Sequence, residues 1–128
     1  MRNLSYIKSL IPSEKIETEK AEELIALGWP TVAPVVVDML LWIQDVNWPV
    51  AQVFMPFLST ISDKILKEVE PVFQTDDAPW KFYCLCVLKD GSYRDWPDSM
   101  RSQMEKLYHY PTDEEKEWEI PELIAELL

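Results

Sequence analysis

Apolar residues recur at helical spacing along most of the chain, and this pattern predicts seven helices. Within residues 30–44, apolar side chains follow the spacing i, i+3, i+4, i+7, i+8 and i+11 of one helical face: Val32, Val35, Val36, Met39, Leu40 and Ile43. Residues 49–61 repeat this spacing, so the two segments predict a pair of core helices. The remaining helices are predicted at 13–27, 63–74, 79–88 and 97–108, and from residue 112 onward.

Capping residues and prolines indicate where the predicted helices begin, bend and end. Ser13 is suited to be the N-cap of the first helix. Thr112 and Glu115 have the spacing of a capping box, so the last helix should begin there. Pro56 should kink its helix without ending it, because the apolar pattern continues past it, and Pro121 should kink or split the last helix.

The helix predicted at residues 79–88 is apolar on all sides, so it should lie centrally. Cys84 and Cys86 lie two residues apart within it and would point to nearly opposite sides. We therefore expect two reduced cysteines rather than a disulfide.

An internal repeat becomes visible when the chain is shifted against itself by 30 residues. Each copy has the order helix, polar turn, proline, helix, and Asn47 and Asp77 are the predicted N-caps of the second helices. A period of this length in helix pairs indicates a short α-solenoid-like fold of the all-α class. The matched positions are Ile43 with Phe73, Gln44 with Gln74, Asn47 with Asp77, Pro49 with Pro79, and Leu58 with Leu88.

Length and composition agree with a helical domain. The chain has 128 residues, 48% of them hydrophobic, so we expect a single domain over residues 1–128 with a substantial core. Two glycines are few for a protein built from β-strands and tight turns, which favours helices.

The net charge of −11 excludes some classes of partner. Nucleic acids and anionic membranes require a basic surface, so neither is expected as a partner. A basic protein partner is compatible with the charge, although the same acids could serve only to keep the protein soluble. No stretch has the apolar length of a signal peptide or a transmembrane helix, so we expect a cytoplasmic protein.

No set of residues indicates catalysis. His109 is the only histidine, and its distance along the chain from Cys84 and Cys86 gives no metal-ligand spacing. The chain has no glycine-rich phosphate loop and no nucleophile elbow. Paired acids such as Asp76 and Asp77 are typical of helix caps and solvated faces. We therefore expect no metal, no cofactor and no enzymatic activity.

Three tryptophans, Trp42, Trp48 and Trp80, lie at or beside the two repeat turns. In one interpretation they seal the ends of the helix pairs. In the other, the turns form a binding surface, where tryptophan is a favoured hot-spot residue. Polar groups that would complete such a surface are Gln44, Asp45, Asn47, Asp77 and Lys81.

The chain resembles an uncharacterised bacterial family known as domain of unknown function 5071. The resemblance covers nearly the whole chain. It implies a HEAT-like all-α fold, and it implies no activity. The residues that carry it are Leu27-Gly28-Trp29-Pro30, then Leu41 to Ala51, then Asp76, Asp77, Trp80 and Lys81, and finally Pro111-Thr112.

Two classes of function follow. The first is a non-catalytic protein-interaction module, of which an immunity protein that neutralises a bacterial toxin is one concrete form; its acidic charge would steer a basic toxin. The second is a small enzyme or ligand-binding protein with a tryptophan-lined pocket between helices.

Overall fold

The computed structural model describes residues 3–128, and within this range it contains only helices, turns and loops. We predicted seven helices, and the described residues form nine α-helices and four short 3₁₀ helices. The α-helices are α1 (Leu4–Ser9), α2 (Thr18–Leu27), α3 (Val36–Leu41), α4 (Pro49–Thr60), α5 (Leu66–Val69), α6 (Ala78–Asp90), α7 (Asp98–His109), α8 (Asp113–Glu117) and α9 (Ile120–Leu127). The 3₁₀ helices are η1 (Ala33–Val35), η2 (Trp42–Gln44), η3 (Ser62–Lys64) and η4 (Glu70–Gln74).

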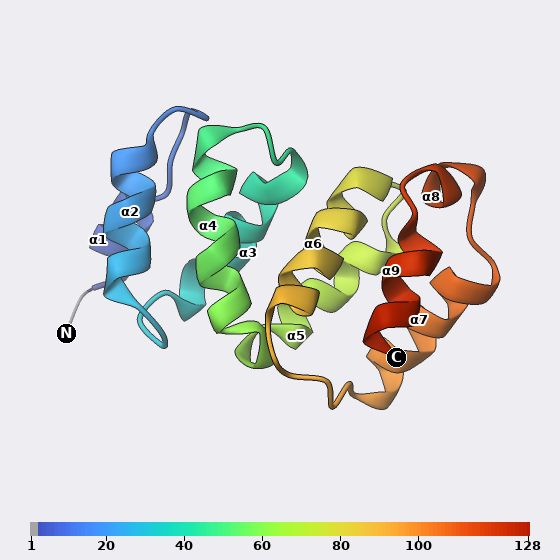
Figure 1. Ribbon diagram of the computed structural model, residues 1–128. Helices are drawn as coiled ribbons and strands as arrows, with labels where there is room; N and C mark the ends of the chain where they lie inside the picture. The colour runs from blue at the N-terminus through green and yellow to red at the C-terminus, as the bar shows by residue number, and fades with distance from the viewer. Residues whose placement is uncertain (1–2) are drawn as a thin grey trace.

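The helices form an elongated array of two layers (Figure 1). One layer consists of α2, α4, α6 and α9, and each of these packs against the next. In the other layer, α1 contacts η1, α3 contacts α5, and η4 contacts α7. Each pair of helices therefore buries its apolar face against its neighbours, and the core runs along the array.

The two segments related by the 30-residue shift have the same order of elements: 3₁₀ helix, α-helix, 3₁₀ helix, turn, long α-helix. The segment predicted as a helix at residues 30–44 is α-helical only at Val36–Leu41, and the one predicted at 63–74 only at Leu66–Val69; 3₁₀ helices flank both. Pro34 lies in η1 and Pro71 in η4, and a proline lacks the N–H group that a continuous α-helix needs. Ile43 also departs from helical geometry, with φ −96° and ψ 20°.

The long helices α4 and α6 agree with the sequence pattern. Helix α4 begins at Pro49 and continues past Pro56, as predicted. Helix α6 contacts α4, α9, η2 and η4, so it lies centrally, as its apolar character predicted. Cys84 is buried on it, Cys86 is half-buried, and both thiols are free.

The start of the chain was predicted incorrectly. Helix α1 was missed; its N-cap is Asn3, whose side chain accepts a 2.8 Å hydrogen bond from the Tyr6 amide. Ser13 is not an N-cap, because α2 begins at Thr18. Instead the Ser13 hydroxyl and amide and the Glu14 amide all donate to the Glu17 carboxylate, and these bonds lower the pKa of Glu17 to about 2.

The last helical segment begins and divides close to the predicted positions. Thr112 and Glu115 form the predicted capping box at the start of α8. The split that we assigned to Pro121 occurs just before it, at Glu119, which has φ 57° in the left-handed region. Helix α9 then begins at Ile120, with the proline in its first turn.

Indole groups tie neighbouring helix pairs together. Three tryptophan side chains each donate a hydrogen bond to a backbone carbonyl that lies 30 to 40 residues away in the chain. Each bond therefore holds together two segments that lie side by side in the array. The bonds are Trp42 Nε1 to Pro12 O (3.0 Å), Trp80 Nε1 to Leu40 O (2.8 Å) and Trp96 Nε1 to Leu127 O (2.9 Å).

Candidate functional site

Three turns lie along one edge of the array, and we call residues 44–49, 74–79 and 110–115 the turn edge. The edge is the upper one in Figure 1, where α4, α6 and α8 begin. The first two turns approach Tyr83: its burial raises its pKa, and the nearby carboxylates of Asp45 and Asp77 add to the effect. The second and third turns line a common cavity, to which both Asp76 and Thr112 contribute.

The first turn joins η2 to α4. Asp45 Oδ1 accepts a 2.9 Å hydrogen bond from the Asn47 amide, which closes the turn. The rings of Trp42 and Trp48 meet edge to face, with centroids 5.5 Å apart. Both rings are half-buried and pack against the core, while Gln44 and Asp45 are partly exposed and Asn47 is exposed. The turn thus combines a sealing role for the tryptophans with accessible polar groups.

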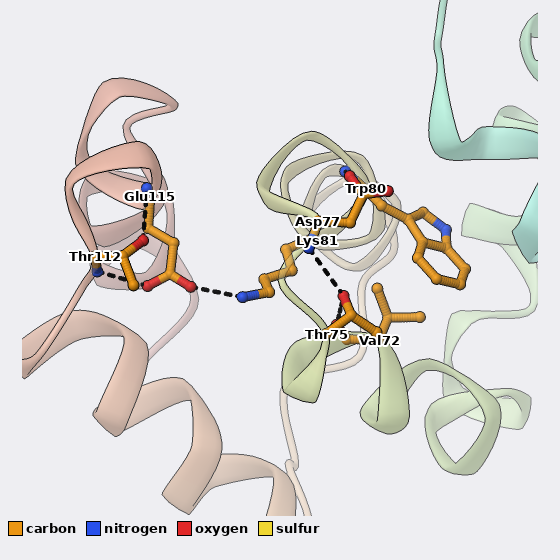
Figure 2. Close-up of polar contacts among 7 residues, drawn as sticks. All are labelled: Val72, Thr75, Asp77, Trp80, Lys81, Thr112 and Glu115. Atoms are coloured by element: carbon orange, nitrogen blue, oxygen red, sulfur yellow. Dashed lines mark hydrogen bonds and ion pairs between the residues drawn. The ribbon is translucent and has the colours of Figure 1, made fainter.

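The second turn joins η4 to α6 (Figure 2). Asp77 is the N-cap of α6, as predicted: its carboxylate accepts a 3.0 Å hydrogen bond from the Trp80 amide. The Thr75 hydroxyl donates to Val72 O at 2.7 Å and accepts a bond from the Asp77 amide. The half-buried Trp80 ring and the Lys81 side chain point to opposite sides of α6.

The prediction that Asn47 caps α4 was wrong. The N-cap of α4 is Trp48, and no side-chain hydrogen bond caps the helix; the backbone N–H of Asn47 donates to Asp45 Oδ1. Pro49 follows the cap directly and needs no hydrogen-bond partner, which removes one of the donors that Asn47 would have satisfied.

This difference between the turns leads to a comparison of two alanine variants. Asp77→Ala should lower the free energy of unfolding by about 1 kcal/mol, because the cap of α6 is lost. Asn47→Ala should change it by less than about 0.5 kcal/mol, because the side chain is exposed and caps nothing. Urea denaturation of both variants checks this, and equal losses would contradict the assignment of the caps.

Lys81 does not belong to the exposed part of the turn edge, contrary to our expectation. It is 5% exposed and points from α6 toward α8, where its Nζ lies 2.6 Å from Glu115 Oε2 (Figure 2). Glu115 is 4% exposed and also accepts a 2.9 Å bond from the Thr112 amide through its other oxygen. The ion pair therefore joins α6 to the capping box of α8.

The ionisation of Glu115 reflects these contacts. Burial by itself would raise the pKa of Glu115, but hydrogen bonds from the Lys81 ammonium and from Thr112 outweigh this effect. The pKa of the carboxyl consequently lies below its usual value, and the group is held in its charged form.

Two cavities border the second turn: Trp80 lines one of them and Lys81 lines the other. The Trp80 pocket has a volume of about 330 Å³ and lies between α3 and the α5–η4 segment; it is lined by Val37, Leu40, Lys67, Glu68, Pro71, Val72, Thr75 and Trp80. The ion-pair cavity has a volume of about 410 Å³ and contains Lys81 and Glu115 in its lining. The surface of the first is mainly apolar, whereas polar and apolar groups contribute similar shares to the surface of the second.

Most of the residues that the sequence singled out lie on the turn edge, but they are divided between two turns and do not form one surface. Trp42, Asp45 and Trp48 share the first turn, and Asp77 and Trp80 share the second. Sequence reasoning missed the functional interest of three residues at the ion-pair cavity. They are Glu115, Gln103 and Tyr110. The capping-box spacing located Glu115 but could not reveal its partner, and no sequence signal pointed to the other two.

Two further observations concern metal ions and membranes. Among residues 3–128, no group of three or more histidine, cysteine or acidic side chains is placed to hold a metal ion. No helix in the same range is long and apolar enough to cross a membrane.

The fold and its turn edge define an all-α protein built from a two-layer array of short helices. Residues 10–128 match the family described as Domain of unknown function (DUF5071), and the chain belongs to this family. The resemblance carried by the Leu-Gly-Trp-Pro step and the tryptophan-rich turn is thereby confirmed. No curated protein matches the chain.

Proposed function

We propose that this protein is a non-catalytic, cytoplasmic interaction module whose turn edge binds a basic protein. The observation that carries the proposal is the charge of the edge. Its three turns contain six acidic residues and no lysine or arginine: Asp45, Asp76, Asp77, Asp113, Glu114 and Glu115. Glu115 pairs with Lys81, and Asp113 lies 4.0 Å from Lys116, so the charge of the edge rests on the other four acids, which speed association with a positively charged partner.

Aromatic side chains on the same edge supply contact area. Tyr110 is 81% exposed, and Trp48 is half-buried at the first turn. Tyrosine and tryptophan are enriched among hot-spot residues of protein interfaces, because a rigid ring gains a large contact area with little loss of conformational freedom. A partner that covers both rings would also lie across the acidic residues between them.

The pairwise packing of the helices supports a HEAT-like repeat, in which turns at one edge are displayed side by side. A concrete form of the proposal is an immunity protein that neutralises a basic toxin. A toxin-like reading frame next to the gene would favour this form over other kinds of interaction.

Charge reversal at the turn edge tests the proposal. The partner is first captured from the native host by the wild-type protein and identified by mass spectrometry. Asp45→Lys should then slow association with that partner at least tenfold at low salt, and added salt should shrink the difference. The measurement is the association rate at several salt concentrations.

Glu22→Lys is the matched control, because Glu22 is exposed on α2 away from the turns and changes the net charge by the same amount. Equal slowing by both variants would show that only net charge matters, and no slowing by Asp45→Lys would contradict the proposed edge.

A ligand-binding protein is the second candidate, and the Trp80 pocket is the observation that favours it. Its lining is almost entirely apolar, and Val37 at its border is 56% exposed. Native mass spectrometry of protein purified from its host separates the two candidates, since a bound small apolar molecule favours this one and a bound protein favours the first.

A further inference from the structure

The ion-pair cavity has the features of a site for a small polar ligand. Its volume of about 410 Å³ lies in the range of small-molecule pockets. Lys81 and Glu115 form part of its lining, and each side chain is 6% exposed, so two charges are held at the cavity by the fold itself. Neither is the end of a flexible surface side chain.

Unsatisfied hydrogen-bonding groups line the same cavity. Gln103 Oε1 is buried and has no hydrogen-bond partner among residues 3–128. The side-chain amide of Gln103 can be turned by 180°, and either its oxygen or its nitrogen would then need a partner in the same place. Within the same described range, the Lys81 ammonium has three N–H groups and one acceptor, Glu115 Oε2. Buried groups of this kind are destabilising unless a water molecule or a bound ligand completes them, and a polar ligand can take the place of the water.

The charges of the lining indicate what kind of molecule fits. The lining contains two lysines, Lys81 and Lys106, and two carboxylates, Asp76 and Glu115, so it has no net charge. A ligand with only one sign of charge would meet repulsion from half of these groups. A zwitterion has an anionic group for the lysines and a cationic group for the carboxylates and the Gln103 oxygen.

We propose that the ion-pair cavity binds a free α-amino acid, with its carboxylate at Lys81 and Lys106 and its ammonium group at Asp76 and Gln103. The apolar part of the lining, Phe73 and Leu107, suits an aliphatic side chain. This site shares Asp76 and Glu115 with the turn edge, but a free amino acid can bind the purified protein without any protein partner, so the two proposals can be tested separately.

Leucine is the probe, and isopentylamine and 4-methylpentanoate are its matched controls, because they lack the carboxylate and the ammonium group respectively. Leucine at ten times its dissociation constant should raise the melting temperature of the wild-type protein by about 4 °C, while neither control compound should raise it measurably. Isothermal titration calorimetry with leucine measures the dissociation constant.

Gln103→Leu gives the decisive comparison. Removing an unsatisfied buried group should leave the unliganded protein as stable as the wild type or more so, while weakening leucine binding at least tenfold. Lys106→Ala should weaken binding as well, and Lys64→Ala, on η3 outside the cavity, should not. Should Gln103→Leu fail to fold, Lys106→Ala and Lys64→Ala carry the same test.

The proposal is overturned if leucine leaves the wild type unchanged, or if the amine or the acid alone stabilises it equally. Equal binding by wild type and Lys106→Ala would also overturn it. None of these outcomes depends on whether the turn edge binds a protein, so this site and the proposed function can fail separately.

Discussion

Replacing Glu115 with glutamine is expected to lower the free energy of unfolding by about 3–5 kcal/mol. Glutamine has nearly the same shape and can still accept a bond from Thr112, but it removes the negative charge beside Lys81. The Lys81 ammonium would then remain 5% exposed without a counter-charge, and a buried unpaired charge is strongly destabilising. Urea denaturation at neutral pH measures the effect.

Two controls separate the buried charge from other causes. Lys81→Met combined with Glu115→Gln should recover most of the loss, because no unpaired charge remains. Glu126→Gln breaks the exposed pair between Lys89 and Glu126, 3.0 Å apart, and should change stability by less than about 1 kcal/mol. If the double variant is no more stable than Glu115→Gln, the loss arises from packing and not from charge.

The same pair makes a specific contribution to acid sensitivity. The pKa of Glu115 is lower in the folded protein than in the unfolded chain, so its contribution to stability is fully present above the unfolded value, about 4.3. The contribution is lost as the pH falls through the folded pKa. The stability difference between wild type and Glu115→Gln should therefore shrink below about pH 4. Glu17 titrates in the same direction, but it is present in both proteins and cancels.

Trp80→Ala is expected to lower the free energy of unfolding by about 3 kcal/mol. The ring packs against the core from the start of α6, and its indole N–H bonds Leu40 O at 2.8 Å. Truncation removes both the apolar contact and the donor, leaving the Leu40 carbonyl without its partner. Thermal and urea denaturation of the purified variant check this.

Trp80→Phe isolates the hydrogen bond, because it keeps a ring but removes the donor. We expect a loss of about 1–2 kcal/mol for this variant. Tyr110→Ala is the surface control: at 81% exposure its ring should contribute less than about 0.5 kcal/mol to stability. A Trp80→Ala variant as stable as Tyr110→Ala would show that the ring is available to a ligand or partner.

Sequence patterns were sufficient where a helix is long and amphipathic or where its cap is local. Helix α4 begins at Pro49 as predicted, and the capping box of Thr112 and Glu115 is present, because both signals depend on residues within a few positions of one another. Asp77 also caps its helix as predicted. Asn47 does not, although it occupies the equivalent position, because Pro49 has no N–H group and the Val50 N–H donates to Lys15 O at 3.1 Å, so neither is left for the Asn47 side chain.

Features that depend on residues distant in the chain could not be predicted. Lys81 follows Trp80 in a turn-like sequence and was expected at the surface, yet it is buried because Glu115, 34 residues later, is there to pair with it. The separation of the turn residues onto two faces likewise follows from the packing of α6 between its neighbours. A periodic pattern indicates which face of a helix is buried, but it does not indicate which distant residue will pair with a polar side chain on that face.

The indole bonds that join neighbouring helix pairs have a consequence for folding kinetics. Each of them closes a segment of only 30 to 40 residues, and the helices that pack against one another along the array are also near neighbours in the chain. The entropy lost on closing a loop grows slowly with its length, and topologies dominated by such short-range closures fold fast. Adding another helix pair to the array would lengthen the protein without introducing a more distant contact, so the slowest closure in the chain would stay the same.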